Sequence, residues 1–215
     1  MDNEFHEEDD LEKLKAWWKN YGSALLIGAV LGTGSLFGYR QWQQYEHDQA
    51  AQASTLYDQV VYQLKQKALD QASSLGGQVM DNYESTPYAG MAALLMARIS
   101  YDRGDITSAK RQLQWAVNNA TIGATRHAAR LRLAKIMRDE GAITEALILL
   151  KVRDRGGFTA EYSELEGDLY AADGMSEEAR AAYAIALSVG QGQNREYETI
   201  LKMKLADLGQ KEAVK

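Results

Sequence analysis

Residues 96–116 read MARISYDRGDITSAKRQLQWA, and two later stretches repeat their pattern: LAKIMRDEGAITEALILLKVR at 133–153 and EGDLYAADGMSEEARAAYAIA at 166–186. A glycine stands at the centre of each stretch, and the three are 37 and 33 residues apart: Gly104, Gly141 and Gly174. Seven positions before each glycine stands a small residue: Ala97, Ala134 and Gly167. Alanine stands five positions after it, and a larger side chain four positions further on: Ala109 with Leu113, Ala146 with Leu150, and Ala179 with Tyr183. The sequence therefore contains an internal repeat with a period in the mid-thirties.

The spacing within each repeat predicts two helices joined by a tight turn. Glycine directly after a helix adopts a left-handed conformation without steric cost, so it ends the first helix. Asp105 and Ser176 follow two of the glycines at positions suited to capping the second helix. Small residues where two helices cross allow close packing, and the larger residue one turn later fills the groove between them.

These features resemble the tetratricopeptide repeat, a helix–turn–helix unit that stacks into a solenoid, so the expected fold class of this part is all-α. The large residue usual early in the first helix is replaced here: Ala93, Arg130 and Ser163. Glu166 also stands where Met96 and Leu133 stand in the other repeats. Five residues are candidates to line a concave surface, although aromatic side chains of this kind more often belong to the core: Tyr83, Tyr88, Tyr101, Arg98 and Arg130.

The sequence on either side of the repeats also predicts helices. Residues 40–66 are expected to form one long helix, and residues 68–82 its partner in a fourth, less regular unit. Gly76-Gly77 interrupts this second pattern, and Pro87 is suited to open the next helix. Residues 196–208 predict a capping helix that covers the last apolar face of the stack.

Composition excludes several classes of protein. The single proline and the many good helix formers argue against an all-β fold. A net charge of −6 offers no broad basic field for nucleic acid. The absence of cysteine excludes disulfides, thiolate metal sites and a thiol nucleophile, and it fits a periplasmic or a cytosolic location equally well.

One stretch of the sequence predicts a transmembrane helix. NYGSALLIGAVLGTGSLFGY, residues 20–39, contains no charged side chain and at about 1.5 Å per residue spans roughly 30 Å, the thickness of a bilayer core. Aromatic residues flank it on both sides, as in membrane anchors: Trp17, Trp18, Tyr21, Tyr39 and Trp42. The alternatives are a buried core helix and a cleaved signal peptide, whose candidate site Gly32-Thr33-Gly34 lies inside the apolar run. The expected segments are an acidic tail (1–20), a transmembrane helix (21–39) and a helical-repeat domain (40–215).

Basic residues near the two ends of the span predict its orientation. Three precede it and one follows: Lys13, Lys15, Lys19 and Arg40. The positive-inside rule then places residues 1–20 in the cytoplasm and the repeat domain on the opposite side. The run Glu7-Glu8-Asp9-Asp10 is expected to be solvated, with contact to a basic cytoplasmic surface as the alternative.

Small residues within the span form a possible helix-packing face. They recur at four-residue spacing: Ala24, Gly28 and Gly32, and then Gly34 with Gly38. Such a ridge allows a second membrane helix to approach closely. The alternative is that glycine is simply common in membrane helices.

No pattern in the sequence predicts catalysis, a metal site or a cofactor site. The three histidines are far apart, so each is interpreted as a solvated surface residue: His6, His47 and His127. Signatures of zinc proteases, serine hydrolases, P-loop proteins and dinucleotide-binding proteins are absent from the sequence. An enzyme is therefore not expected.

The run KAWWKNYGSALLIGAVLGTGSLFGYRQW, residues 15–42, carries a more specific resemblance. Basic and aromatic residues, an Asn-x-Gly turn, a glycine-rich span and a closing Gly-x-Arg-x-Trp together resemble the YfgM-like family of ancillary SecYEG translocon subunits. QAAQASTLYDQVV after the span and Tyr88-Ala89-x-x-Ala92 before the repeats resemble it too.

The resemblance implies a single-pass protein of the bacterial inner membrane whose helical domain faces the periplasm. It implies association with the SecYEG translocon and with a membrane-anchored periplasmic chaperone of the peptidyl-prolyl isomerase class (PpiD-like). In that role the protein would help to pass newly exported proteins to periplasmic chaperones. A membrane-anchored scaffold that organises another envelope complex is the alternative.

Overall fold

The computed structural model describes residues 4–190 and 195–213, except for the side chains of residues 4–14, 23–25, 27, 29 and 210–213. The chain divides into two compact units, Met1–Gln49 and Ala50–Lys215, and each is described by itself. Within the described residues the secondary structure is helical throughout: α1 (Glu4–Lys65), α2 (Leu69–Asn82), α3 (Pro87–Asp102), α4 (Ile106–Asn119), α5 (Gly123–Asp139), α6 (Ile143–Leu150), the short 3-10 helix η1 (Gly156–Phe158), α7 (Thr159–Ala172), α8 (Ser176–Gly190) and α9 (Arg195–Ala213).

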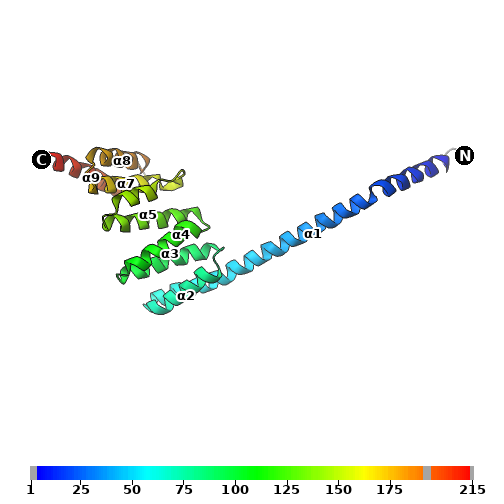
Figure 1. Cartoon of the computed structure of the whole chain (residues 1–215), viewed down its shortest axis with the longest axis horizontal. Coiled ribbons are helices and arrows are strands. Elements are labelled where there is room, and N and C mark those ends of the chain that lie inside the picture. The colour runs from blue at the N-terminus through cyan, green and yellow to red at the C-terminus, as the bar shows by residue number, and fades with distance from the viewer. Residues whose placement is uncertain (1–3, 191–194, 214–215) are drawn as a thin grey trace. The chain divides into compact units, whose positions relative to one another are not determined.

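The second unit is a stack of helical hairpins that follow one another in chain order (Figure 1). The end of α1 pairs with α2, α3 with α4, α5 with α6, and α7 with α8, while α9 covers the last hairpin. Apolar clusters fill the spaces between successive helices, so each hairpin is stabilised mainly by its neighbours. The predicted helical-repeat architecture is confirmed.

The turn glycines adopt the predicted left-handed conformation. The φ angles are +80°, +79° and +78° at Gly104, Gly141 and Gly174. At each turn the following residue donates a backbone hydrogen bond to a carbonyl five residues earlier, as from Asp105 to Ser100. The predicted cap is also confirmed at Asp105, whose carboxylate accepts from the Ser108 backbone N–H at 3.0 Å.

A fourth turn of the same geometry joins α1 to α2 without a glycine. Lys67 occupies the turn position at a φ of 60°, and Ala68 donates to the Gln63 carbonyl as Asp105 does to Ser100. The sequence pattern did not reveal this turn, because lysine stands where the other repeats have glycine. The predicted partner helix at 68–82 is confirmed as α2.

Two local predictions are wrong. Gly76-Gly77 does not interrupt the second helix, since both residues lie inside α2. A β-carbon on Gly76 would come within 2.4 Å of the Met96 side chain, so this glycine allows α3 to approach α2 closely. Ser176 is the first residue of α8 and not the residue before it.

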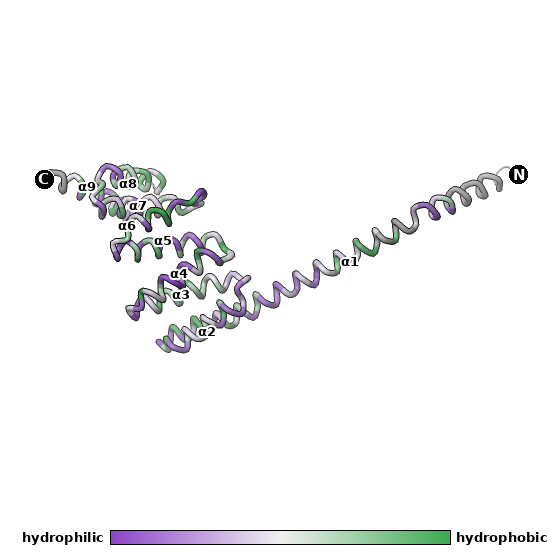
Figure 2. The backbone as a smooth tube through the Cα atoms, viewed as in Figure 1, coloured by the Kyte–Doolittle hydropathy of each residue, from purple (hydrophilic) through white to green (hydrophobic). Residues whose placement is uncertain are grey.

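The predicted transmembrane helix is not confirmed by the first unit. Among the residues that the structure describes, no helix is both long enough and apolar enough to cross a membrane. Five side chains of the predicted span lie outside the described residues: Ser23, Ala24, Leu25, Ile27 and Ala29. Figure 2 shows that α1 becomes mainly hydrophilic as it approaches α2.

Candidate functional site

A groove of about 440 Å³ lies between α3 and α5, the first helices of two successive hairpins. Its floor is apolar and comes from three helices: Leu94, Leu95, Ala97, Leu113 and Ile136. The Tyr101 ring lines the same groove and is 45% exposed. The volume lies in the range of roughly 300–1,000 Å³ that is typical of ligand pockets.

The rim of the groove is mainly cationic. Four basic side chains and one carboxylate line it: Arg98, Arg132, Lys135, Arg138 and Asp139. Arg98 donates to Asp102 along α3 at 2.7 Å, and both side chains remain exposed. Arg132 and Lys135 are also exposed, and within the described part of the chain neither forms an ion pair. The groove therefore offers an apolar floor beside positive charge.

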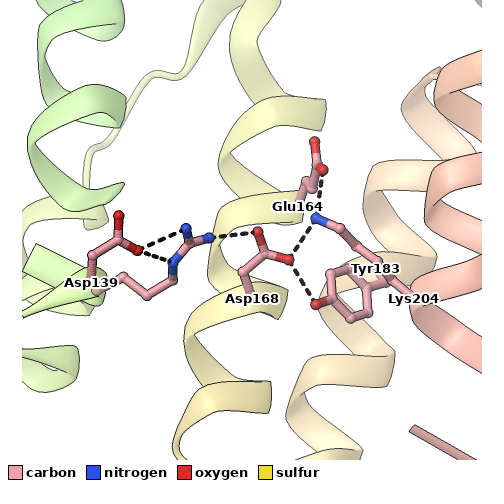
Figure 3. Close-up of polar contacts among 6 residues, drawn as sticks. Asp139, Glu164, Asp168, Tyr183 and Lys204 are labelled. Atoms are coloured by element: carbon pink, nitrogen blue, oxygen red, sulfur yellow. Dashed lines mark hydrogen bonds and ion pairs between the residues drawn. The ribbon is translucent and has the colours of Figure 1, made fainter. Parts of the chain in front are cut away.

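Asp168 of α7 is the centre of a polar network next to this rim (Figure 3). Its carboxylate accepts hydrogen bonds from Arg138 at 3.0 Å, from Lys204 at 2.6 Å and from the Tyr183 hydroxyl at 2.8 Å. Arg138 also pairs with Asp139 at 2.9 Å, and Lys204 also pairs with a carboxylate of α7. The network thus connects α5, α7, α8 and α9.

The network is partly buried, which makes its pairing important for stability. The side chains of Asp168, Lys204 and Arg138 are only 17%, 28% and 30% exposed. Burial, reinforced by the hydrogen bond to Asp168, raises the pKa of the Tyr183 phenol above its ordinary value of 10. A tyrosine held in this way stays protonated and acts as a donor, so the arrangement positions helices and prepares no general base.

His127 of α5 lies in a second polar cluster, and its interpretation as a solvated surface residue is wrong. The ring is half-buried, stacks on Phe158 at 5.2 Å, and its Nδ1 lies 2.9 Å from the Tyr162 hydroxyl. Arg130 donates to the same hydroxyl oxygen at 3.4 Å, and the Tyr162 side chain is fully buried. Since that oxygen accepts from Arg130, its proton is free to be donated to a neutral His127.

The pKa of His127 is lowered from 6.5 by burial and by the adjacent charge of Arg130. The unfolded chain therefore binds a proton at His127 more readily than the folded chain does. The contribution of neutral His127 to the free energy of unfolding is complete above pH 6.5 and is lost as the pH falls below that value. We expect the thermal midpoint of the full chain to fall between neutral pH and pH 5.5, and His127→Gln to reduce this fall. The measurement is thermal denaturation followed by circular dichroism at several pH values. His47→Gln, at an exposed position of α1, is the matched control; equal pH profiles of His127→Gln and the native chain would contradict the assignment.

The unusual residue Glu166 is explained by the loop that precedes α7. Arg155 of this loop forms a bidentate ion pair with Glu166, and its guanidinium lies 5.2 Å from the centre of the Tyr162 ring. Because α6 has only 8 residues, the chain leaves the hairpin early and the loop contacts α7. A carboxylate therefore replaces the apolar residue of the other repeats at this position.

The predicted helix-packing face lies in α1. The four glycines are exposed, and a β-carbon added to any of them would meet no atom within 4 Å: Gly28, Gly32, Gly34 and Gly38. The fifth member, Ala24, has a side chain outside the described residues. Nothing in the chain occupies this face where it is described, and its role stays a prediction.

The structure separates the five residues predicted to line a concave surface. Arg98 and Tyr101 line the groove, whereas Arg130 belongs to the Tyr162 cluster. Tyr88 packs on Tyr57 at 5.8 Å, and the Tyr83 hydroxyl donates to a side chain of α1. No sequence motif singles out the two exposed cations of α5, Arg132 and Lys135. The repeat pattern contains a sign of one of them, Lys135. A charged residue stands six positions before each turn glycine: Arg98, Lys135 and Asp168.

Among the described residues, no group of three His, Asp or Glu side chains is placed to hold a metal ion. The polar clusters around Asp168 and Tyr162 consist of groups that already pair with one another. The groove between α3 and α5, which combines apolar lining with exposed cations, is therefore the candidate binding site.

Comparison with known proteins agrees with the helical-repeat fold. The sequence model of the family described as "Tetratricopeptide repeat-like domain" matches residues 15–210. A Haemophilus influenzae protein named "Ancillary SecYEG translocon subunit" is 29% identical over 202 residues, which cover 94% of this chain and 97% of that protein. An Escherichia coli protein of the same name is 26% identical over 178 residues, which cover 83% of this chain and 85% of that protein. The resemblance to the YfgM-like family is thus confirmed.

Solved structures are similar in fold. A TPR-like repeat protein of Podosopora anserina matches 77% of this chain and 89% of its own, with a TM-score of 0.56 and 17% sequence identity. At this identity the likeness concerns the fold alone, and it agrees with the hairpin stack. On the match over residues 15–210, this chain belongs to the tetratricopeptide repeat-like domain family.

Proposed function

We propose that this chain is a membrane-anchored ancillary subunit of the bacterial Sec translocon, with a repeat domain that binds other proteins. The observation that carries the proposal is the match of almost the whole chain to relatives that bear this name. The groove between α3 and α5 supports the binding role, because it presents apolar and charged groups together on an exposed face. Binding, and not catalysis, is the activity that these residues suit.

The proposed anchor is the segment 21–39 of the bacterial inner membrane, with residues 1–20 in the cytoplasm and residues 40–215 in the periplasm. Its support comes from the uncharged run at 20–39 and from the excess of lysine before it. The aromatic residues at the two ends are exposed in α1 and form close pairs. The ring centres of Trp17 and Tyr21 lie 6.0 Å apart, and those of Tyr39 and Trp42 lie 6.5 Å apart.

The proposed mechanism is an increase in local concentration. Anchoring the repeat domain beside the translocon raises its effective concentration toward newly exported chains without high affinity. A PpiD-like membrane-anchored chaperone on the periplasmic side is the proposed partner of the repeats. The emerging protein would then pass from the translocon to this chaperone.

The test is co-purification from native membranes in mild detergent. The native chain is compared with a version whose residues 21–39 are replaced by an unrelated membrane helix. Recovery of translocon subunits and a periplasmic chaperone with the native chain supports the proposal. Loss of the translocon alone after replacement assigns docking to the span. Recovery of a different envelope complex in place of the translocon contradicts the proposal and supports a scaffold.

Replacing Gly28 and Gly32 together with leucine is expected to reduce the recovery of the translocon severalfold, because the larger side chains prevent a second helix from approaching. The substitutions should not disturb the chain itself, since no atom lies within 4 Å of either added β-carbon. Quantitative co-purification is the measurement. Val30→Leu with Thr33→Leu is the control, because these exposed positions lie about 150° around the helix from Gly28 and Gly32 and outside the predicted packing face. Unchanged recovery with both double variants would contradict a docking role for this face.

A further inference from the structure

Helix α5 is basic, although the protein as a whole is acidic. The chain has a net charge of −6, yet α5 carries five basic residues and one carboxylate: Arg126, Arg130, Arg132, Lys135, Arg138 and Asp139. The first helix of the next hairpin, α7, carries four carboxylates and no basic residue: Glu161, Glu164, Glu166 and Asp168.

Three of the five cations of α5 have partners within the domain. Arg126 donates to the Ala120 carbonyl, Arg130 donates to the Tyr162 hydroxyl, and Arg138 pairs with Asp168. These contacts account for the complementarity between α5 and its neighbours.

Arg132 and Lys135 differ from these three. Both line the groove toward α3, both are exposed, and the described residues include no carboxylate in an ion pair with either. Arg98 faces them across the groove, and its exposed ion pair with Asp102 contributes little to stability. Internal pairing therefore leaves two positive charges available at the rim of an apolar groove.

We propose that this groove binds a short acidic segment of a partner protein, whose carboxylates pair with Arg132 and Lys135 while an apolar side chain contacts Leu95 and Tyr101. The proposal rests on the proposed role of the repeats in protein binding and specifies the chemistry of the partner. Charge complementarity selects the occupant. An apolar segment alone would remove water from the cations without pairing them, which is unfavourable.

The surroundings and the size of the groove favour a peptide segment over other anions. Asp102 and Asp139 border the cations, so a polyphosphate chain, which is charged along its whole length, would meet repulsion at both sides of the groove. A volume of about 440 Å³ accommodates a few side chains but no folded domain. Charge-assisted hydrogen bonds to arginine and lysine are the strong type in such sites.

The test uses the purified full chain in detergent and a fluorescent synthetic peptide of Glu-Leu-Glu-Phe repeats, with anisotropy as the readout. We expect the peptide to bind at least about tenfold more tightly than the analogues in which Gln or Lys replaces every Glu. Arg132→Glu with Lys135→Glu is expected to weaken binding of the acidic peptide at least about tenfold. Added salt should weaken binding to the native chain.

Lys151→Glu with Arg153→Glu is the matched control, since it reverses two exposed cations in the loop after α6 and should leave affinity unchanged. Circular dichroism of each variant verifies that the helices are retained. Equal binding of the acidic and Gln peptides, equal affinity in the two double variants, or full competition by an oligonucleotide would each overturn the proposal.

Translocon co-purification is measured in parallel. If the native chain recovers the translocon but does not prefer the acidic peptide, the groove assignment fails while the proposed function stands; the reverse result rejects the proposed function alone.

Discussion

Replacing Asp168 with alanine is expected to lower the free energy of unfolding by about 2–3 kcal/mol, because it leaves three partly buried groups without their shared acceptor. Arg138, Lys204 and Tyr183 all donate to this carboxylate, and they come from α5, α9 and α8. Breaking a fully buried ion pair costs about 3–5 kcal/mol. The expected loss is smaller here because Arg138 and Lys204 keep 30% and 28% exposure and can regain some hydration.

Urea denaturation of the full chain in detergent, followed by circular dichroism, is the measurement. Asp139→Ala is the matched control: its side chain is 54% exposed and pairs with Arg138, which still has Asp168 as a partner. We expect the control to lower the free energy of unfolding by less than about 0.5 kcal/mol. Equal losses in the two variants would show that Asp168 does not join the last hairpins as described.

The fold was predictable from sequence where a physical requirement selects one kind of residue. A left-handed turn favours glycine, so Gly104, Gly141 and Gly174 predicted three turns. The fourth turn was not predictable, because Lys67 accepts the same conformation under the packing of the surrounding helices. Gly76 shows the opposite case. Nothing in its sequence neighbourhood indicates that Met96 of another helix lies against it, because a contact of this kind depends on tertiary packing.

The candidate site was predictable only in part. Arg98 and Tyr101 were identified as surface candidates by residue type, and both line the groove. Arg130 is an arginine of a first helix like Arg98, yet it does not line the groove. It donates instead to the hydroxyl of the buried Tyr162. Which arginine of α5 faces α3 and which faces α7 depends on the rotation of one helix between two others. Helical periodicity alone does not fix that rotation when cations occur on several faces.

Gly167→Ala is expected to lower the free energy of unfolding by about 2 kcal/mol. The added β-carbon would lie 2.5 Å from the Tyr183 ring, closer than atoms can approach. That ring is 3% exposed and its hydroxyl is held by Asp168, so it cannot move aside without breaking the network. Overpacking of this kind costs up to about 3 kcal/mol, and the better helix propensity of alanine offsets about 1 kcal/mol of it.

Gly77→Ala is the matched control, because this glycine also lies inside a helix but has no atom within 4 Å of an added β-carbon. There the same change is expected to raise the free energy of unfolding by up to about 1 kcal/mol, as alanine favours the helix. Urea denaturation of the two variants therefore separates close helix packing from helix propensity by the sign of the change. A stabilising effect of Gly167→Ala would mean that α7 and α8 do not approach each other at this point. A double-mutant cycle with Tyr183→Ala identifies the cause, since removing the ring should abolish the penalty of the added methyl group.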